Sequence, residues 1–281
     1  MRIEVDGTRL FFDVAGTRLV PEGRVMREKP TLILLHGGPG ADHSIFRPEF
    51  DALADVAQVI FLDLRGQGRS DKSAPERRTL AQWGDDVRGF CDALGIERPI
   101  VHGHSFGGMV AMAYATRHPE HPGKLVLSAT YARQNIPRVA QRCEELGGPE
   151  VRDAAQRMWS EPGPEAQAEY NRLVLRYYTR ELPSNLDGAF RVRFRNDVGL
   201  QFAAGEMQSF DLLRQLSTLV CPVLVLGGAL DPVCPIEDQE DIAAALPADR
   251  VSFERFEECG HMIWIDAPER YFRALREFVA S

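Results

Sequence analysis

Short apolar runs alternate with amphipathic stretches along most of the chain, and this pattern predicts its secondary structure. Strands are predicted at residues 31–38, 57–71, 99–103, 124–130, 221–232 and 250–256, the second of which runs into a polar, glycine-rich loop. Apolar residues at helical spacing predict helices at 79–96, 105–119 and 267–280. Strands that alternate with helices indicate a doubly wound, mostly parallel α/β sheet. Two alternating runs at 2–16, joined around Asp6-Gly7, predict a hairpin that adds antiparallel edge strands.

The stretch 131–217 has a different pattern. It is rich in Arg, Glu and Gln, breaks at 147–149 and 161–164, and shows helical periodicity such as that of 169–182. It contains no run that resembles a buried strand. We therefore expect a helical lid, or cap, at 131–217, inserted into a core made of 1–130 and 218–281.

The sequence GHSFG at 103–107 places Ser105 between a predicted strand and a predicted helix. A sharp strand–helix turn needs small residues where the backbone segments crowd together, and the flanking glycines meet that need. The helix start directs free N–H groups toward any anion that forms there. An isolated serine at such a point is usually a helix cap. The strand–turn–helix context favours a nucleophile instead.

A second glycine-rich stretch, HGGPG at 36–40, follows another predicted strand. An oxyanion hole needs two backbone N–H groups that converge on one oxygen. The residue after the nucleophile, Phe106, can supply one of them, and Gly38 is the candidate for the other. The alternative is a glycine-rich turn without a ligand. His36 is expected to be a structural hydrogen-bonding residue under this loop.

Candidates for the acid and the base occur after the last two predicted strands. Asp231 follows the apolar strand in VLVLGGALDP, and His261 lies between the strand 250–256 and the final helix. Alone, an Asp before Pro is usually a turn former and a loop His is usually solvated. The order Ser, Asp, His, each at the carboxyl end of a strand, predicts a nucleophile, an orienting acid and a general base.

These motifs together resemble a known family. HGGPG, DLRGQGRSD (63–71), GHSFGG, GALDP (228–232) and ECGH (258–261) stand in the order found in α/β-hydrolase-fold serine hydrolases, and the resemblance covers nearly the whole chain. HGGPG combined with D-x-R-G-x-G-R-S is most similar to the prolyl iminopeptidase branch. This resemblance implies a cofactor-free enzyme that forms an acyl-enzyme and releases N-terminal proline from short peptides or amides.

Two stretches depart from the iminopeptidase pattern. The elbow is GHSFGG, which is common in esterases and lactonases, where the peptidases usually carry a sequence such as GGSWG. In AGEMQSF (204–210), Glu206 is displaced from the position of the glutamate that binds the free amino end, and Glu169 and Glu181 are weaker candidates. A small ester or lactone therefore remains an alternative substrate. A non-catalytic small-ligand receptor on the same fold is a second alternative.

Charge and composition limit the classes of partner that the protein is expected to bind. The net charge of −8 argues against nucleic-acid and anionic-membrane partners, which favour basic surfaces. The N-terminal residues lack the pattern of a secretory signal, and no apolar run is long enough to cross a bilayer, so a cytoplasmic location is expected. Five scattered cysteines without a CxxC motif predict free thiols. The HGH at 102–104 lacks the Asp-His that follows it in metallo-hydrolases, so no metal is expected.

Overall fold

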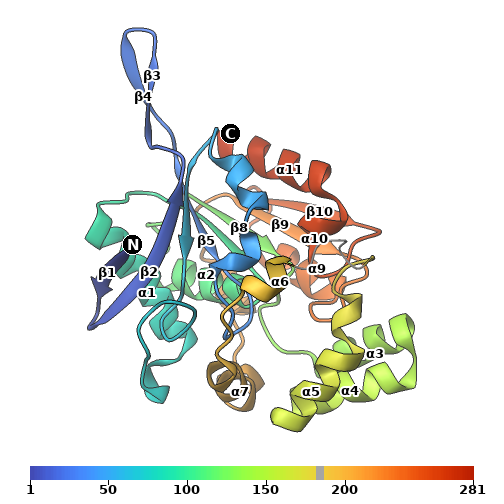
Figure 1. The fold of residues 1–281 in the computed structure, drawn as a ribbon. Helices are drawn as coiled ribbons and strands as arrows, with labels where there is room; N and C mark the ends of the chain where they lie inside the picture. Colours follow the sequence, from blue (N-terminus) through green and yellow to red (C-terminus); the bar gives the residue numbers. More distant parts are fainter. Residues whose placement is uncertain (182–186) are drawn as a thin grey trace.

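The computed structural model describes residues 1–181 and 187–281 and is built around one large sheet (Figure 1). Its eight described strands are, in order across the sheet, β1 (Arg2–Val5), β2 (Thr8–Ala15), β6 (Gln58–Leu62), β5 (Thr31–Leu35), β7 (Ile100–His104), β8 (Lys124–Ser128), β9 (Val223–Gly228) and β10 (Val251–Phe256). The β1–β2 and β2–β6 pairs are antiparallel, and every pair from β6 to β10 is parallel. The predicted α/β sheet with antiparallel edge strands is confirmed.

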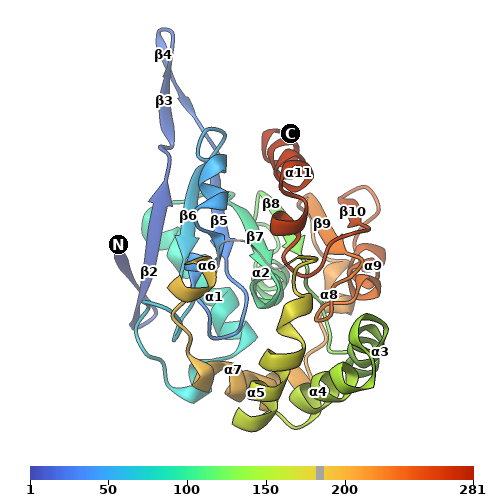
Figure 2. The same cartoon turned by 45° about the vertical axis from the view of Figure 1, so that its right-hand side comes forward.

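Helices cover both faces of the sheet (Figure 2). One apolar cluster packs α1 (Leu80–Leu94), α2 (Phe106–Arg117) and α9 (Ile236–Ala245) on one face. The other cluster packs α10 (Ile263–Asp266) and α11 (Pro268–Ala280) on the opposite face, with the short 3₁₀ helices η1 (His43–Phe46) and η2 (Glu49–Leu53). Side chains alternate between these faces along each strand, so a strand covered on both sides is mostly apolar. This explains the apolar run Leu32–Leu35 of β5, in which every residue is buried.

Two elements were not predicted from the sequence. The hairpin of β3 (Leu19–Glu22) and β4 (Val25–Glu28) projects from the body of the molecule, and its residues are largely exposed (Figures 1 and 2). An exposed hairpin has no buried face and therefore leaves no apolar alternation in the sequence. The helix α9 was also missed, because its acidic first turn obscures the few apolar positions that face the core.

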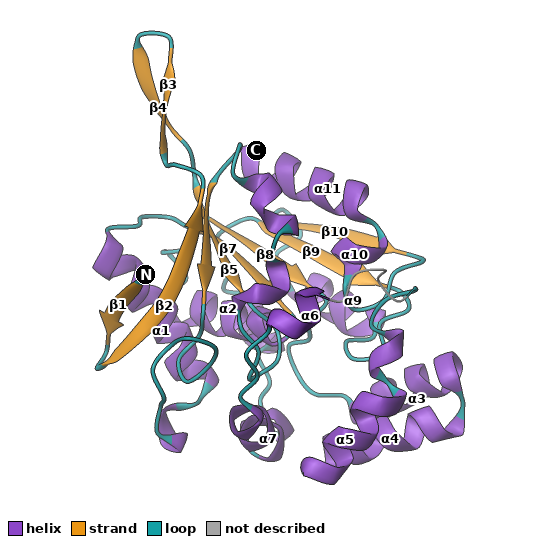
Figure 3. Cartoon of the chain, in the orientation of Figure 1, coloured by secondary structure: helices purple, strands orange, loops and turns teal. Residues whose placement is uncertain are grey.

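The chain between β8 and β9 forms helices and no strand in its described part (Figure 3). The α-helices are α3 (Ile136–Gly147), α4 (Pro149–Ser160), α5 (Pro164–Leu173), α6 (Asp187–Arg191), α7 (Asn196–Ala204) and α8 (Leu213–Leu216). Two 3₁₀ helices, η4 (Leu175–Tyr177) and η5 (Glu206–Gln208), lie between them. A single β-bridge between Arg133 and Asp211 holds the two ends of this segment together. Most of the helices lie beyond the carboxyl ends of the parallel strands. No helix of the described residues is both long and apolar enough to cross a membrane.

The turn from β7 into α2 is the tightest backbone crossing in the core. A Cβ added at Gly107 would lie 2.1 Å from the carbonyl oxygen of Leu35, and one added at Gly103 would lie 2.3 Å from that of Gly107. Both obstacles are buried backbone atoms, which cannot swing aside as a side chain can. The approach of α2 to β5 and β7 therefore requires glycine at these two positions.

Gly107→Ala tests this requirement. We expect it to lower the free energy of unfolding by at least about 3 kcal/mol, because the new methyl group overpacks a site bounded by backbone. Urea-induced unfolding provides the measurement. Gly163→Ala is the matched control, because nothing lies within 4 Å of its added Cβ. A Gly107→Ala variant as stable as the wild type contradicts the steric argument.

Candidate active site

Ser105 occupies the turn between β7 and α2 in a strained conformation. Its φ is 54° and its ψ is −121°, a region that residues other than glycine rarely adopt. Hydrogen bonds fix its backbone on both sides. Its N–H donates to the Ser128 carbonyl at 2.9 Å, and its carbonyl accepts from the Thr130 hydroxyl at 2.7 Å. The surrounding structure thus holds the Ser105 side chain at the start of α2, where it is 5% exposed.

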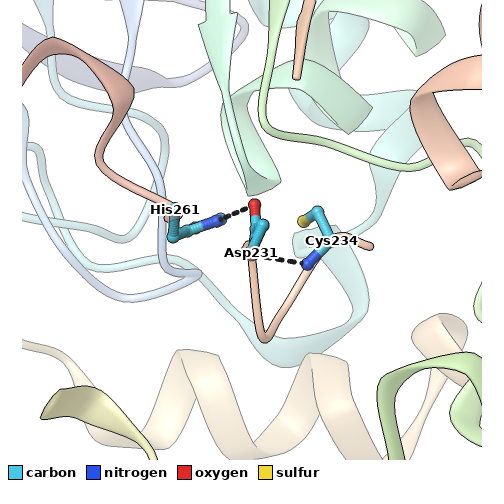
Figure 4. Close-up of side chains that lie close together, drawn as sticks. All are labelled: Asp231, Cys234 and His261. Carbon is cyan, nitrogen blue, oxygen red and sulfur yellow. Dashed lines mark hydrogen bonds and ion pairs between the residues drawn. The ribbon is translucent and has the colours of Figure 1, made fainter. Parts of the chain in front are cut away.

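His261 and Asp231 lie together in the loops that follow β10 and β9 (Figure 4). The Nδ1 atom of His261 is 2.8 Å from Oδ2 of Asp231. The other carboxylate oxygen, Oδ1, accepts hydrogen bonds from the backbone N–H groups of Val233 and Cys234 at 2.7 and 2.9 Å. A carboxylate can only accept, so Nδ1 carries the proton and Nε2 of a neutral His261 keeps its lone pair. This is the tautomer that a general base needs.

Cys234 lies next to both Ser105 and the Asp231–His261 pair. The side chains of Ser105 and Cys234 are near enough to interact, and the sulfur lies in one cluster with Asp231 and His261. Burial raises the pKa of Cys234 well above its ordinary value, although the interaction with Ser105 opposes this shift, so the group is a neutral thiol. Of the three predicted residues, the structure joins His261 directly to Asp231. No direct hydrogen bond from the Ser105 hydroxyl to His261 is present.

The HGGPG loop after β5 lies against the nucleophile candidate. A Cβ added at Gly37 would be 3.3 Å from the Ser105 Cβ, and Gly38 has a φ of 124°. Phe106 is the first residue of α2, so its N–H has no partner within the helix. The two N–H groups predicted to bind an oxyanion, those of Gly38 and Phe106, therefore belong to backbone segments that adjoin Ser105.

His36 has the supporting position expected of it. Its Nε2 accepts a hydrogen bond from the backbone N–H of Leu64 at 3.2 Å, and its Nδ1 is 2.8 Å from the Gly37 carbonyl. Burial lowers the pKa of His36, which keeps the ring neutral and allows one nitrogen to accept while the other donates. His36 thus links the HGGPG loop to the loop after β6.

The loop after β6 is braced by buried charges. Asp63 accepts from both the backbone N–H and the ring Nδ1 of His43, and from the backbone N–H of Arg69. Arg65 pairs with Asp86 of α1 through two hydrogen bonds of 2.6 and 2.7 Å. Each of these carboxylates is buried and has at least one donor, so the segment DLRGQGRSD serves as a rigid support under the HGGPG loop.

Two aromatic rings contact His261, and a third packs behind one of them; none of these contacts was predicted from the sequence. His104 lies 4.7 Å from the His261 ring centroid, and Tyr178 lies 5.0 Å from it. Trp264 stacks edge-on against His104 at 4.6 Å. The Nδ1 atom of His104 is buried without a hydrogen-bond partner, and burial lowers the pKa of His104 well below its ordinary value. These contacts confine the His261 ring on the sides that Asp231 leaves open.

The glutamates predicted as ligands for an amino group are engaged elsewhere or exposed. Oε2 of Glu206 accepts the backbone N–H of Leu80, the first residue of α1, at 2.8 Å. Burial raises the pKa of Glu206 despite this hydrogen bond. Glu169 forms an ion pair with Arg157, and Glu181 is exposed. Glu206 therefore joins η5 to the start of α1, a role that the sequence did not suggest.

The fold and the site together define a class of protein. A candidate nucleophile at a strand–helix turn of a mostly parallel sheet, with an acid and a histidine after later strands, is the arrangement of α/β hydrolases. Residues 30–268 match the family model described as alpha/beta hydrolase fold. The chain belongs to this family, and the predicted fold and the prediction of an α/β-hydrolase-fold enzyme are confirmed.

Individual relatives span almost the full chain. A relative from Caulobacter sp. (strain K31), named as the carbamate hydrolase RutD, is 28% identical over 258 residues, which cover 89% of this chain and 90% of the relative. The proline iminopeptidase of Thermoplasma volcanium is 23% identical, covering 99% of this chain and 95% of the relative. The structure of a thermophilic esterase from Thermogutta terrifontis has a TM-score of 0.73 at 26% identity, covering 100% of this chain and 98% of the esterase. The names of these relatives differ in substrate.

The position of Glu206 leads to a prediction about stability. We expect Glu206→Ala to lower the free energy of unfolding by about 1 kcal/mol, because the first N–H of α1 loses its acceptor. Glu206→Gln should retain most of the stability, since its amide oxygen can accept the same hydrogen bond. Urea-induced unfolding of the three proteins measures the difference. Equal losses in the two variants, or none in either, contradict this role of Glu206.

Proposed function

We propose that this chain is a serine hydrolase that works through an acyl-enzyme. Ser105 is the nucleophile, His261 is the general base and Asp231 orients the imidazole. The backbone N–H groups of Gly38 and Phe106 bind the oxyanion. The observation that carries the proposal is the hydrogen bond between Nδ1 of His261 and Oδ2 of Asp231, formed beside a serine held at positive φ.

The reaction follows from these positions. When substrate binds, the Ser105 hydroxyl donates a hydrogen bond to Nε2 of His261. His261 takes the hydroxyl proton as the oxygen attacks the carbonyl carbon, and Asp231 stabilises the imidazolium. The proton then passes to the leaving group as the tetrahedral intermediate collapses to the acyl-enzyme. A water molecule attacks the ester in the second half, with His261 again acting as the base.

The helical segment 131–217 acts as a lid in this proposal. Two of its contacts support the assignment. The backbone N–H of Arg195 donates to the Gly40 carbonyl of the HGGPG loop at 2.7 Å, and the carbonyl of Tyr178 accepts from the N–H of Met262, next to His261, at 2.9 Å. Since Ser105 and His261 are almost fully buried, substrate entry requires a part of this segment to move.

The charges around the site favour an uncharged ester or lactone as substrate. A buried ammonium group needs a carboxylate partner to offset its desolvation. Glu206 and Glu169 already have partners, as described above. Among the described residues, the buried carboxylates other than Asp231 are all in ion pairs: Asp42 with Arg69, Asp63 with His43, Asp86 with Arg65 and Asp238 with Arg138. The half-buried Glu206 and Asp266 accept backbone N–H groups instead, from Leu80 for Glu206 and from Gly260 and Arg180 for Asp266, so each of these carboxylates already has a donor.

Proline iminopeptidase activity is the second candidate. The combination of HGGPG with DLRGQGRSD supports it, and so do relatives named as proline iminopeptidases, two of which are 25% identical and cover 97% of this chain. The GHSFGG elbow and the engaged Glu206 weigh against it. We therefore rank ester or lactone hydrolysis first, whereas the sequence motifs alone favoured iminopeptidase activity.

Ser105→Ala tests the nucleophile. We expect turnover to fall by about 10³-fold or more, because the members of such a triad act as a unit. A fluorophosphonate probe should label the wild type and not the variant, as intact-protein mass spectrometry can measure. Circular dichroism and thermal unfolding serve as the control for folding. A folded Ser105→Ala protein that keeps most of its activity would exclude Ser105 as nucleophile, and labelling without turnover of any substrate would favour a receptor.

A substrate panel tests the substrate class. Short acyl esters and lactones should be hydrolysed with a kcat/KM at least about tenfold higher than that for the anilide of unblocked proline, since Glu206, the candidate carboxylate for the ammonium group, already accepts the backbone N–H of Leu80. Glu206→Gln should change neither rate by more than about twofold, because it preserves the hydrogen bond to Leu80.

The same panel identifies the iminopeptidase if that is the activity. Faster cleavage of the proline anilide than of any ester, with a sharp loss on N-acylation of the proline or in Glu206→Gln, would overturn the ester assignment. The matched control is Glu169→Gln, because Glu169 pairs with Arg157 and should leave both activities unchanged.

A further inference from the structure

Cys234 has no part in the proposed reaction, yet it lies at the centre of the site. Its side chain is fully buried and interacts with Ser105, and its sulfur belongs to a compact cluster with Asp231 and His261 (Figure 4). One ligand atom from each of these three residues lies within 4.8 Å of the other two. All three residues are buried.

The three donors match those that bind zinc. A thiolate, an imidazole and a carboxylate are the ligand types of tetrahedral Zn²⁺ sites, with metal–ligand distances of about 2.0–2.3 Å. Such distances place neighbouring ligand atoms roughly 3.3–3.8 Å apart. To close around an ion, the Asp231–His261 pair, now 2.8 Å apart, has to separate by about 0.5 Å, and the Cys234 sulfur, which lies within 4.8 Å of both, has to approach by at most about 1 Å. The Ser105 hydroxyl, which contacts the sulfur, or a water molecule can occupy the fourth position.

The backbone already holds two of these donors in place. Cys234 follows Asp231 by three residues, and its N–H donates to Oδ1 of Asp231 at 2.9 Å. The remaining oxygen, Oδ2, faces His261 at 2.8 Å. The His261 ring is itself confined by Tyr178 and His104. The three side chains thus converge from a rigid loop and a packed ring, which lowers the entropy lost on binding an ion.

We propose that Asp231, Cys234 and His261 form an inhibitory site for a thiophilic divalent metal ion such as Zn²⁺. Binding replaces the thiol proton, which leaves to solvent, with a metal–sulfur bond, and the Nδ1 proton of His261 is transferred through solvent to Nε2 as Nδ1 binds the ion. It also takes up His261 and Asp231, so the base can no longer accept the Ser105 proton. The metal acts here as an inhibitor and has no part in the reaction. Loss of turnover rests on the proposed function, whereas binding of the ion does not.

Another cysteine offers a matched comparison. Cys143 of α3 is also buried and donates to the carbonyl of Pro232 in the same loop, at 3.4 Å. Among the described residues, however, Asp231, Cys234 and His261 are the one group of His, Cys, Asp and Glu side chains arranged to share an ion. Cys143 is therefore a buried thiol close to the same loop but outside the proposed site, which makes it the control.

The test compares Cys234→Ala with Cys143→Ala. Zn²⁺ is titrated against ester hydrolysis by the wild type and both variants, each relative to its own metal-free rate. We expect reversible inhibition of the wild type and of Cys143→Ala, relieved by a chelator, and at least a tenfold higher inhibitory concentration for Cys234→Ala. Cys234→Ser replaces the alanine variant if that protein fails to fold. Equal inhibition of all the proteins, or none of the wild type, overturns the proposal.

Co²⁺ provides a measurement that does not depend on turnover. Cobalt bound to a thiolate gives a charge-transfer absorption in the near ultraviolet, which should appear with the wild type and Cys143→Ala and be absent with Cys234→Ala. If the protein hydrolyses no substrate on the panel, this absorption and a Zn²⁺-dependent rise in Tm still test the site. Absence of both signals in the wild type overturns the metal site even when the hydrolase assignment holds.

Discussion

The crossing of β7 and α2 is the constraint on which the site depends. A Cβ added at Gly107 would lie only 2.1 Å from the carbonyl oxygen of Leu35, so no side chain fits between α2 and the end of β5. Leu35 is the last residue of β5, the strand that leads into HGGPG. Ser105, two residues before Gly107 in the same turn, has a φ of 54°. One steric requirement thus fixes the distance between the helix start and the glycine loop, in the turn that directs the serine side chain. A helix displaced by a methyl group would separate the two predicted halves of the oxyanion hole.

The second half of the site depends on loops that hold one another. Asp231 is bound on one oxygen by two backbone N–H groups of its own loop and on the other by His261. The loop of His261 is in turn held by Tyr178, whose carbonyl accepts the N–H of Met262. The helical segment thus contacts the base through Tyr178 and the HGGPG loop through Arg195. Movement of that segment is therefore coupled to both sides of the candidate nucleophile.

Much of the fold and of the candidate site could be predicted from short stretches of sequence, because both depend on burial and on local backbone stereochemistry. Buried strands such as β5 are mostly apolar, and strand–turn–helix stereochemistry requires the glycines around Ser105, so both features can be recognised directly in the sequence. The hairpin at 19–28 has no recognisable pattern of apolar residues, since it is exposed on both faces. Glu206 was predicted as a ligand, whereas the structure shows its carboxylate on the N–H of Leu80, 126 residues earlier in the chain. No local pattern records a contact between such distant segments.

Cys234 shows how backbone and side chain at one position can serve separate purposes. The N–H of residue 234 is needed to hold Oδ1 of Asp231, and any residue except proline provides it. The thiol is not required for that bond. A small apolar residue would pack in the same space without placing a metal ligand beside Asp231 and His261. The Cys234 thiol places a sulfur donor, the type that soft metal ions prefer, beside the carboxylate of Asp231 and the imidazole of His261. The hydrogen bond that would orient His261 for proton transfer in the proposed reaction therefore also belongs to the proposed metal site.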